Sequence, residues 1–170
     1  NSVIGAAAIR ANLGGVEVLG ILDGYTHLMR GDTSQVMPLD IEAVSRIHFR
    51  GGSILRTARA NPTKRPEHIA ACLAAFERLG VDKLVSIGGD DTCFSALTLA
   101  RSSGGKLKVV HVPKTIDNDL DLPPGIPTFG YQTAREYWFP DLRSTGGVAL
   151  VMSCVLYPYV YLTARVVFIM

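Results

Sequence analysis

Between positions 16 and 112, short continuous apolar runs typical of buried strands alternate with segments whose apolar residues have helical spacing. A run of apolar and β-branched residues at 16–22 ends at Asp23-Gly24, which predicts a buried strand followed by a turn. Helix, strand, helix and strand patterns follow it in that order. Because crossovers join strands that alternate with helices, this order predicts an α/β domain with a mostly parallel sheet.

Two helices and two further strands make up this segment. Pro66 suits the first turn of the first helix, and Gly80 stands where a left-handed cap is expected. The apolar face of this helix has helical spacing and comprises Ile69, Leu73, Phe76 and Leu79. Strands are predicted at 84–87 and 107–112, with a helix between them that ends at 103–105. An Ala-rich helix is predicted before this segment, up to Asn12.

Acidic loops follow the last two predicted strands, at 88–92 and 113–119. In an open parallel sheet, the ligand crevice lies at the carboxyl ends of the strands. The two loops therefore predict one shared site.

The first loop, Gly-Gly-Asp-Asp-Thr at 88–92, suits a phosphate group. Its glycines leave backbone N–H groups open at the start of a helix, where an anion is stabilised. Mg²⁺ binds carboxylate and phosphate oxygens together, which makes Asp90 a candidate ligand of this ion. A tight turn with an aspartate cap explains the same residues equally well.

The second loop, Pro-Lys-Thr-Ile-Asp-Asn-Asp at 113–119, combines a cation, a hydroxyl and carboxylates directly after a buried strand. A carboxylate held rigidly there could act as general base for an alcohol beside a bound phosphate. The alternative is a solvated loop with a structural salt bridge. A solvated loop alone does not explain why Lys114 and Asp117 occur together.

Composition limits which binding partners and which cellular compartment we expect for this protein. The 170 residues are 48% hydrophobic and 19% charged, as in a globular domain, and the net charge is +2. This charge provides no general field for nucleic acid or an anionic membrane, so neither is expected as a partner. Cys72, Cys93 and Cys154 lack the spacing of a zinc site or a disulfide framework, and the N-terminus has no export signal. We expect a cytoplasmic protein.

An uncharged run at 144–164 is long enough in principle to cross a bilayer. It contains Ser, Thr, Gly-Gly and Pro158 and is crowded with β-branched residues and tyrosines. We interpret it as buried strands or as an aberrant, disordered tail rather than a membrane span.

Three motifs together resemble the phosphofructokinase family. Gly-Gly-Ser to Thr-Ala-Arg at 51–59 is followed by the loops at 88–92 and 113–119, in the family's order and spacing. The resemblance covers 1–136, and residues 1–4 look like the end of the family's first glycine-rich loop. It implies an incomplete three-layer α/β/α sandwich over 1–136, a divergent tail at 137–170, and phosphorylation of fructose 6-phosphate on its 1-hydroxyl, a step of glycolysis.

The resemblance also implies roles for individual residues. Asp117 matches the family's catalytic base, and Thr115 and Asp119 match residues that hold the phosphoryl group and the sugar. Asp90 matches the magnesium-associated aspartate. The residues implied for the donor phosphates are Arg59, Gly89, Thr92 and Lys114.

Asp91 and Lys114 indicate the phosphoryl donor. ATP-using relatives typically have glycine at both positions, whereas this pair resembles pyrophosphate-dependent members. A carboxylate at Asp91 would lie where the α-phosphate of ATP must pass, and two close anions repel each other. Lys114 would neutralise the compact pyrophosphate instead. The pair therefore joins Asp117 among the expected catalytic residues, with ATP as the alternative donor.

The resemblance ends after the Phe-Gly-Tyr-Gln-Thr-Ala-Arg-Glu segment at 129–136. The family's later sugar-binding elements are not found beyond it, so we expect this chain to be inactive alone and to form a homo-oligomer if completed. A truncation, a fragment and a degenerate paralogue each fit this pattern. A non-catalytic subunit that pairs with a complete phosphofructokinase is the alternative function.

Overall fold

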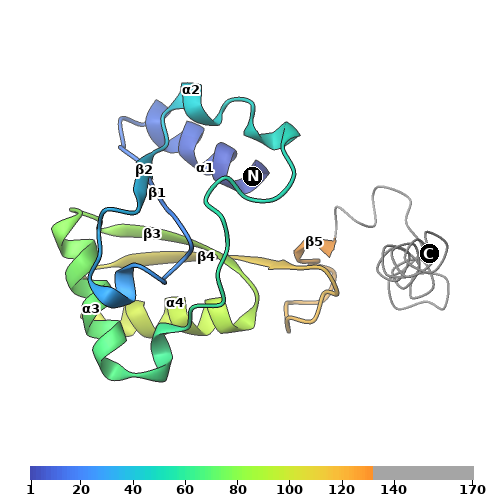
Figure 1. Cartoon of the computed structure of the whole chain (residues 1–170). Helices are drawn as coiled ribbons and strands as arrows, with labels where there is room; N and C mark the ends of the chain where they lie inside the picture. The colour runs from blue at the N-terminus through green and yellow to red at the C-terminus, as the bar shows by residue number, and fades with distance from the viewer. Residues whose placement is uncertain (132–170) are drawn as a thin grey trace, which may run out of the picture. The chain divides into compact units, whose positions relative to one another are not determined.

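A computed structural model describes residues 1–131 of the chain. Its α-helices and strands are labelled in Figure 1. In chain order they are α1 (Ser2–Leu13), β1 (Leu19–Ile21), β2 (Val36–Pro38), α2 (Ile41–Val44), α3 (Pro66–Arg78), β3 (Lys83–Gly88), α4 (Asp90–Ser102), β4 (Lys108–Thr115) and β5 (Phe129–Gly130). Short 3₁₀ helices lie at Leu28–Arg30, Ile47–Phe49 and Pro62–Lys64. These residues divide between a first unit, 1–86 with 91–111, and a second unit, 87–90 with the chain from 112.

Helix α3 begins and ends where its sequence predicts. Pro66 occupies the first turn together with Glu67, whose negative charge is stabilised by the N-terminal end of the helix dipole. After the helix ends, Gly80 has a φ of +68°, a backbone conformation that costs glycine little because it has no Cβ. These signals confirm the predicted boundaries.

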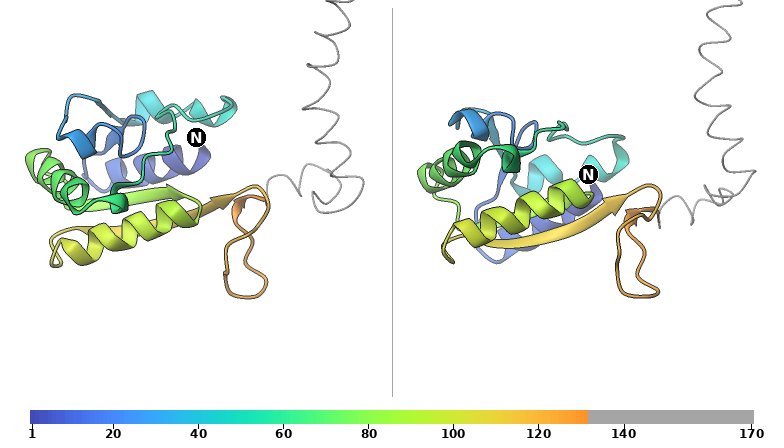
Figure 2. Two further views of the ribbon diagram at one scale, coloured as in Figure 1. Left: turned by 60° about the horizontal axis from the view of Figure 1, so that its bottom comes forward. Right: turned by 90° about the horizontal axis from the view of Figure 1, so that it is seen from below.

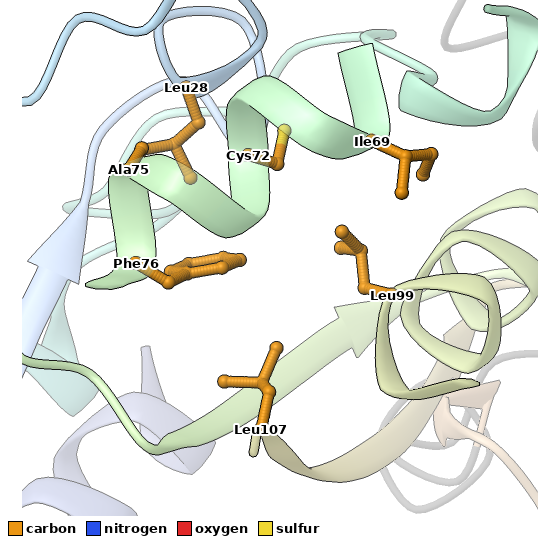
Figure 3. Packing of buried hydrophobic residues seen from close by; sticks show 7 residues of the cluster. All are labelled: Leu28, Ile69, Cys72, Ala75, Phe76, Leu99 and Leu107. Atoms are coloured by element: carbon orange, nitrogen blue, oxygen red, sulfur yellow. The ribbon is translucent and has the colours of Figure 1, made fainter. Parts of the chain in front are cut away.

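One face of α3 forms the larger apolar cluster of the first unit. Figure 3 shows Ile69 and Phe76 of α3 on the side of the helix that faces Leu99 of α4 and Leu107, which precedes β4. The buried members of the cluster are Leu28, Ile69, Cys72, Ala75, Phe76, Leu99 and Leu107. Burying a side chain such as Phe76 contributes about 1.5–3 kcal/mol, so this cluster fixes α3 and α4 to each other.

Burial also changes the chemistry of Cys72. The side chain has no exposed surface, and desolvation raises the pKa of its thiol to about 12. Cys72 is therefore a neutral thiol at physiological pH.

The β3–α4–β4 segment has the strand–helix–strand order that the sequence predicts for an α/β domain. The strands form a three-stranded sheet in the order β3-β4-β5, and β4 pairs with β5 in parallel. Figure 2 shows α4 on one side of β3 and β4 and α1 on the other. This layering confirms the predicted α/β sandwich.

Strand β1 departs from the prediction for 16–22. It is three residues long and pairs in antiparallel fashion with β2, outside the parallel sheet. Val16 is 45% exposed, so the apolar run is not buried along its whole length. The run indicated an extended segment correctly. The prediction that this strand joins the parallel sheet was wrong. Apolarity does not specify which strand pairs with it, and β2 lies closer in sequence than β3.

The second unit contains a further correction. The segment at 113–119 was expected to be a loop, but β4 continues through Pro113, Lys114 and Thr115. Lys114 is paired with Phe129, and Thr115 with Gly130 of β5. Pairing with this later strand extends β4 beyond the apolar run that marked it in the sequence.

Helix α1 confirms the Ala-rich helix expected near the start of the chain, and it packs in a smaller cluster. The buried residues of that cluster are Ala8, Leu39, Val44 and Ile47. Within residues 1–131, no helix combines the length and apolarity that a membrane crossing would need. The uncharged run at 144–164 and the expected tail at 137–170 lie outside the described residues.

Candidate active site

The acidic loop at 88–92 is built into the junction between β3 and α4. Gly88 ends β3, and Asp90, Asp91 and Thr92 form the first turn of α4. Both aspartates are exposed. A carboxylate in the first turn stabilises a helix by about 0.3–1 kcal/mol, because unpaired N–H groups there carry partial positive charge. Helix stabilisation and ligand binding can thus use the same residues.

The glycine of this junction lies next to the end of β4 in the second unit. A Cβ placed on Gly89 would be 3.9 Å from Cγ2 of Thr115. Within the second unit, the structure therefore brings the backbone of Gly89 close to Thr115.

Lys114 and Thr115 are held by the β4–β5 pairing, and the chain then leaves the strand. Lys114, Asp117 and Asp119 are exposed. A cation and two carboxylates thus lie within a few residues of one another after a strand terminus, on the exposed surface.

A hydrogen-bond network organises the turn that carries Asp117. The hydroxyl of Thr115 lies 2.7 Å from that of Thr128, and the backbone N–H of Asn118 donates to Thr115 Oγ1 at 3.1 Å. The backbone N–H of Thr128 donates to Asn118 Oδ1 at 2.8 Å. Thr128 is completely buried, so water does not compete for these bonds.

Asn118 has a left-handed backbone conformation, with a φ of +56°. Asparagine tolerates this region better than most residues. Its backbone and side chain are both bonded, to Thr115 and Thr128. The turn therefore places Asp117 and Asp119 on either side of a fixed residue.

Arg59 lies in the first unit, in an extended segment that is anchored to α4. Two residues later, Asn61 caps the following 3₁₀ helix by accepting from Thr63 N–H at 2.9 Å. The hydroxyl of Ser95 of α4 lies 2.8 Å from the carbonyl oxygen of Asp91 and 3.4 Å from Asn61 Oδ1. The Arg59 segment is thus tethered beside the first turns of α4, and Arg59 itself is exposed.

A second anchor lies upstream of Arg59. Arg56 Nη1 lies 3.2 Å from Asp23 Oδ2, and the N–H of Asp23 donates to the carbonyl oxygen of Leu55 at 2.9 Å. Both Asp23 and Arg56 have positive φ, at 55° and 58°. Their pairing holds two sparsely populated conformations together.

The predicted site residues thus fall into two groups. The first unit holds Arg59, Asp91 and Thr92, and the second holds Gly89, Asp90, Lys114, Thr115, Asp117 and Asp119. Within each group the structure provides defined anchors for the backbone.

Metal binding was expected at Asp90. Within residues 1–131, no three His, Cys, Asp or Glu side chains are gathered as a metal-binding group. Mg²⁺ is usually held by one or two carboxylates together with substrate phosphates and water. The exposed carboxylate of Asp90, at a glycine junction, fits that mode of binding.

Sequence reasoning gave no role to Thr128, and none to Asn118 within its motif. An asparagine between two aspartates is a signal for a left-handed turn. Thr128 offered no comparable signal, because its contact with Thr115 depends on a chain reversal that spacing does not reveal.

Comparison with known proteins places these motifs in a family. The family model described as Phosphofructokinase matches residues 1–143. A pyrophosphate–fructose 6-phosphate 1-phosphotransferase of Thermotoga maritima is 56% identical over 135 residues, which are 79% of this chain and 32% of the relative. The protein of the same name from Naegleria fowleri is 53% identical over 137 residues, 81% of this chain and 31% of the relative.

ATP-dependent relatives are also similar to the chain. ATP-dependent 6-phosphofructokinase 1 of Thermus thermophilus is 42% identical over 120 residues, 71% of this chain and 36% of the relative. A solved phosphofructokinase structure from Saccharomyces cerevisiae has a TM-score of 0.67 at 21% identity, over 95% of this chain and 22% of that one. The chain thus spans about a third of the length of the curated relatives it matches. It belongs to the phosphofructokinase family.

Proposed function

We propose that this chain is the donor-binding part of an enzyme that transfers a phosphoryl group from pyrophosphate to the 1-hydroxyl of fructose 6-phosphate, giving fructose 1,6-bisphosphate. The observation that carries the proposal is 56% identity to the Thermotoga maritima protein named for this transfer. The ATP-dependent relative from Thermus thermophilus is 42% identical.

Asp117 acts as the general base. The attacking sugar hydroxyl must lose its proton as its oxygen bonds to phosphorus, and a carboxylate within hydrogen-bond reach can accept that proton. The exposed carboxylate of Asp117 on a hydrogen-bonded turn suits this task. Thr115 and Asp119, which flank it, hold the phosphoryl group and the sugar.

The donor phosphates are bound by groups from both motifs. Arg59 and Lys114 supply positive charge, while Gly89 and Thr92 supply N–H or hydroxyl donors at the start of α4. Phosphoryl transfer depends mainly on positioning and charge neutralisation, so these contacts contribute most in the transition state.

Asp90 would hold Mg²⁺ together with the donor phosphates. When bound, the ion neutralises charge that develops on the phosphate oxygens. The surrounding residues of the chain then orient the donor and accept the proton.

Donor choice follows from the charges at Asp91 and Lys114. The carboxylate of Asp91 repels the additional phosphate that ATP would bring past the start of α4, whereas Lys114 attracts the compact pyrophosphate. The scattered cysteines, with Cys72 kept as a buried thiol, suit a reducing cytoplasm. A completed enzyme is expected to be a homo-oligomer.

The test is ligand-dependent thermal stability of the 170-residue chain, because a ligand that binds only the folded state stabilises it. We expect magnesium pyrophosphate to raise the Tm, and MgATP to raise it less at equal concentration. Asp90→Asn and Lys114→Gly should each reduce the rise in Tm caused by magnesium pyrophosphate, whereas Lys106→Gly, in the bend that follows α4, should not. A larger effect of MgATP would favour the ATP-dependent alternative, and no effect of either ligand would count against donor binding by this chain.

A further inference from the structure

The backbone N–H and the side-chain hydroxyl of Thr128 both make hydrogen bonds to the turn at 115–118. Its hydroxyl lies 2.7 Å from Thr115 Oγ1 and 3.3 Å from the carbonyl oxygen of Thr115, and its N–H bonds the Asn118 side chain. Together with the Asn118 N–H bond to Thr115 Oγ1, these contacts close a ring through three residues.

The hydroxyl protons in this ring have a consistent assignment. A carbonyl oxygen can only accept, so the bond to the Thr115 carbonyl uses the hydroxyl proton of Thr128. The hydroxyl of Thr115 is then the donor in the 2.7 Å bond and accepts from Asn118 N–H. Thr128 thereby fixes the direction of the Thr115 hydroxyl and the backbone of the turn together.

The ring encloses the position of Asp117. Asp117 lies between Thr115 and Asn118, both of which are anchored, while its own side chain is exposed. Asparagine tolerates the left-handed conformation of Asn118, and here the bonds of this residue to Thr115 and Thr128 hold it. The side-chain hydroxyl of Thr128 holds Thr115, while its backbone N–H, which Thr128→Val and Thr128→Ser both retain, holds the Asn118 side chain.

We propose that Thr128 is a positioning residue for phosphoryl transfer, which fixes the turn that presents the Asp117 carboxylate. This inference rests on the proposed function, in which Asp117 is the general base. Thr128 touches neither substrate nor metal in this role and acts through Thr115 and Asn118.

The experiment compares Thr128→Val, which keeps the shape and loses the hydroxyl, with Thr128→Ser, which keeps the hydroxyl. Thr98→Val is the matched control, because Thr98 also donates its hydroxyl to a backbone carbonyl, that of Phe94, but lies in the first unit. Amide hydrogen exchange of the 170-residue chain reports on the turn at Asn118 and, as a check of folding, on α3. Turnover is measured in a chimera in which the 135 matching residues replace those of the Thermotoga maritima relative.

In Thr128→Val we expect exchange at Asn118 to accelerate about tenfold while α3 remains protected, because one buried hydrogen-bond partner is removed. In the chimera, kcat should fall about tenfold with KM for fructose 6-phosphate nearly unchanged. Thr128→Ser should restore both quantities, and Thr98→Val should change neither. Unchanged exchange at Asn118 in Thr128→Val would overturn the inference, as would unchanged kcat in an active chimera. An inactive parent chimera would instead contradict the proposed function, and the exchange rates alone would then decide whether Thr128 holds the turn.

Discussion

At the scale of single residues, the proposed role of Asp117 predicts that its removal affects turnover and leaves sugar binding nearly intact. In the chimera, we expect Asp117→Ser to lower kcat by about 100- to 10,000-fold, the usual contribution of a general base. KM for fructose 6-phosphate should stay nearly constant, because the other sugar contacts remain. Steady-state kinetics measure both quantities. Equal turnover in parent and mutant would remove Asp117 from the catalytic role.

We expect Asp91 and Lys114 to make opposite contributions to the choice of donor. Asp91→Gly in the chimera removes a barrier and should admit some ATP, whereas Lys114→Gly removes an attraction and should mainly damage pyrophosphate turnover. The double mutant should combine the gain and the loss. The measurement is kcat/KM for each donor at saturating magnesium and fructose 6-phosphate. A parent chimera that already prefers ATP would contradict the pyrophosphate assignment.

At this scale the sequence suggested candidate chemistry but not the contacts that support it. Asp117 and Lys114 became candidates because their charges occur together after a strand, and their roles stay predictions. Thr128 was not identified, because its contact with the hydroxyl of Thr115 depends on how the chain folds back and not on a local sequence pattern. Residue types indicate chemistry, whereas the contacts that hold them depend on tertiary structure.

At the scale of elements, the pairing of β4 with β5 depends on a glycine. Gly130 has a φ of +90°, and a Cβ there would lie 2.7 Å from the carbonyl oxygen of Thr115. Gly130→Ala should destabilise the chain by about 1–3 kcal/mol, the usual cost of a residue held in a strained conformation, with any steric clash in addition. Urea unfolding measures this change.

Gly125→Ala provides the matched control for that substitution. Gly125 also has a positive φ, +85°, but a Cβ there would meet nothing within 4 Å. Its substitution should therefore report the backbone strain alone. If both variants lose equal stability, close packing against Thr115 is not what requires glycine at 130.

The elements were predicted where local signals define them. Pro66 and Gly80 mark the ends of α3, and the apolar runs mark β3 and the first part of β4. The partner of β1 and the end of β4 were missed, because each depends on a strand elsewhere in the chain. Local patterns predict an element, whereas pairing decides its length and its sheet.

At the scale of the whole molecule, we expect the 170-residue chain to show no measurable phosphorylation of fructose 6-phosphate by itself. It spans about a third of the length of its curated relatives, and the family's sugar-binding elements were not found in its sequence. A coupled assay for fructose 1,6-bisphosphate, with the chimera as positive control, measures this activity. Robust turnover of the purified chain would show that the residues after 136 complete a sugar site after all.

The buried thiol of Cys72 provides a way to measure how often the core of the first unit opens. Alkylating reagents attack thiolates, and a thiol with a pKa of about 12 inside the α3 cluster offers almost none until the cluster opens. If Cys93 and Cys154 are replaced by serine, each labelling event at Cys72 records an opening of the first unit. The rate of labelling then reports the frequency of local opening of this core under native conditions. The measurement needs neither denaturant nor an assay of activity.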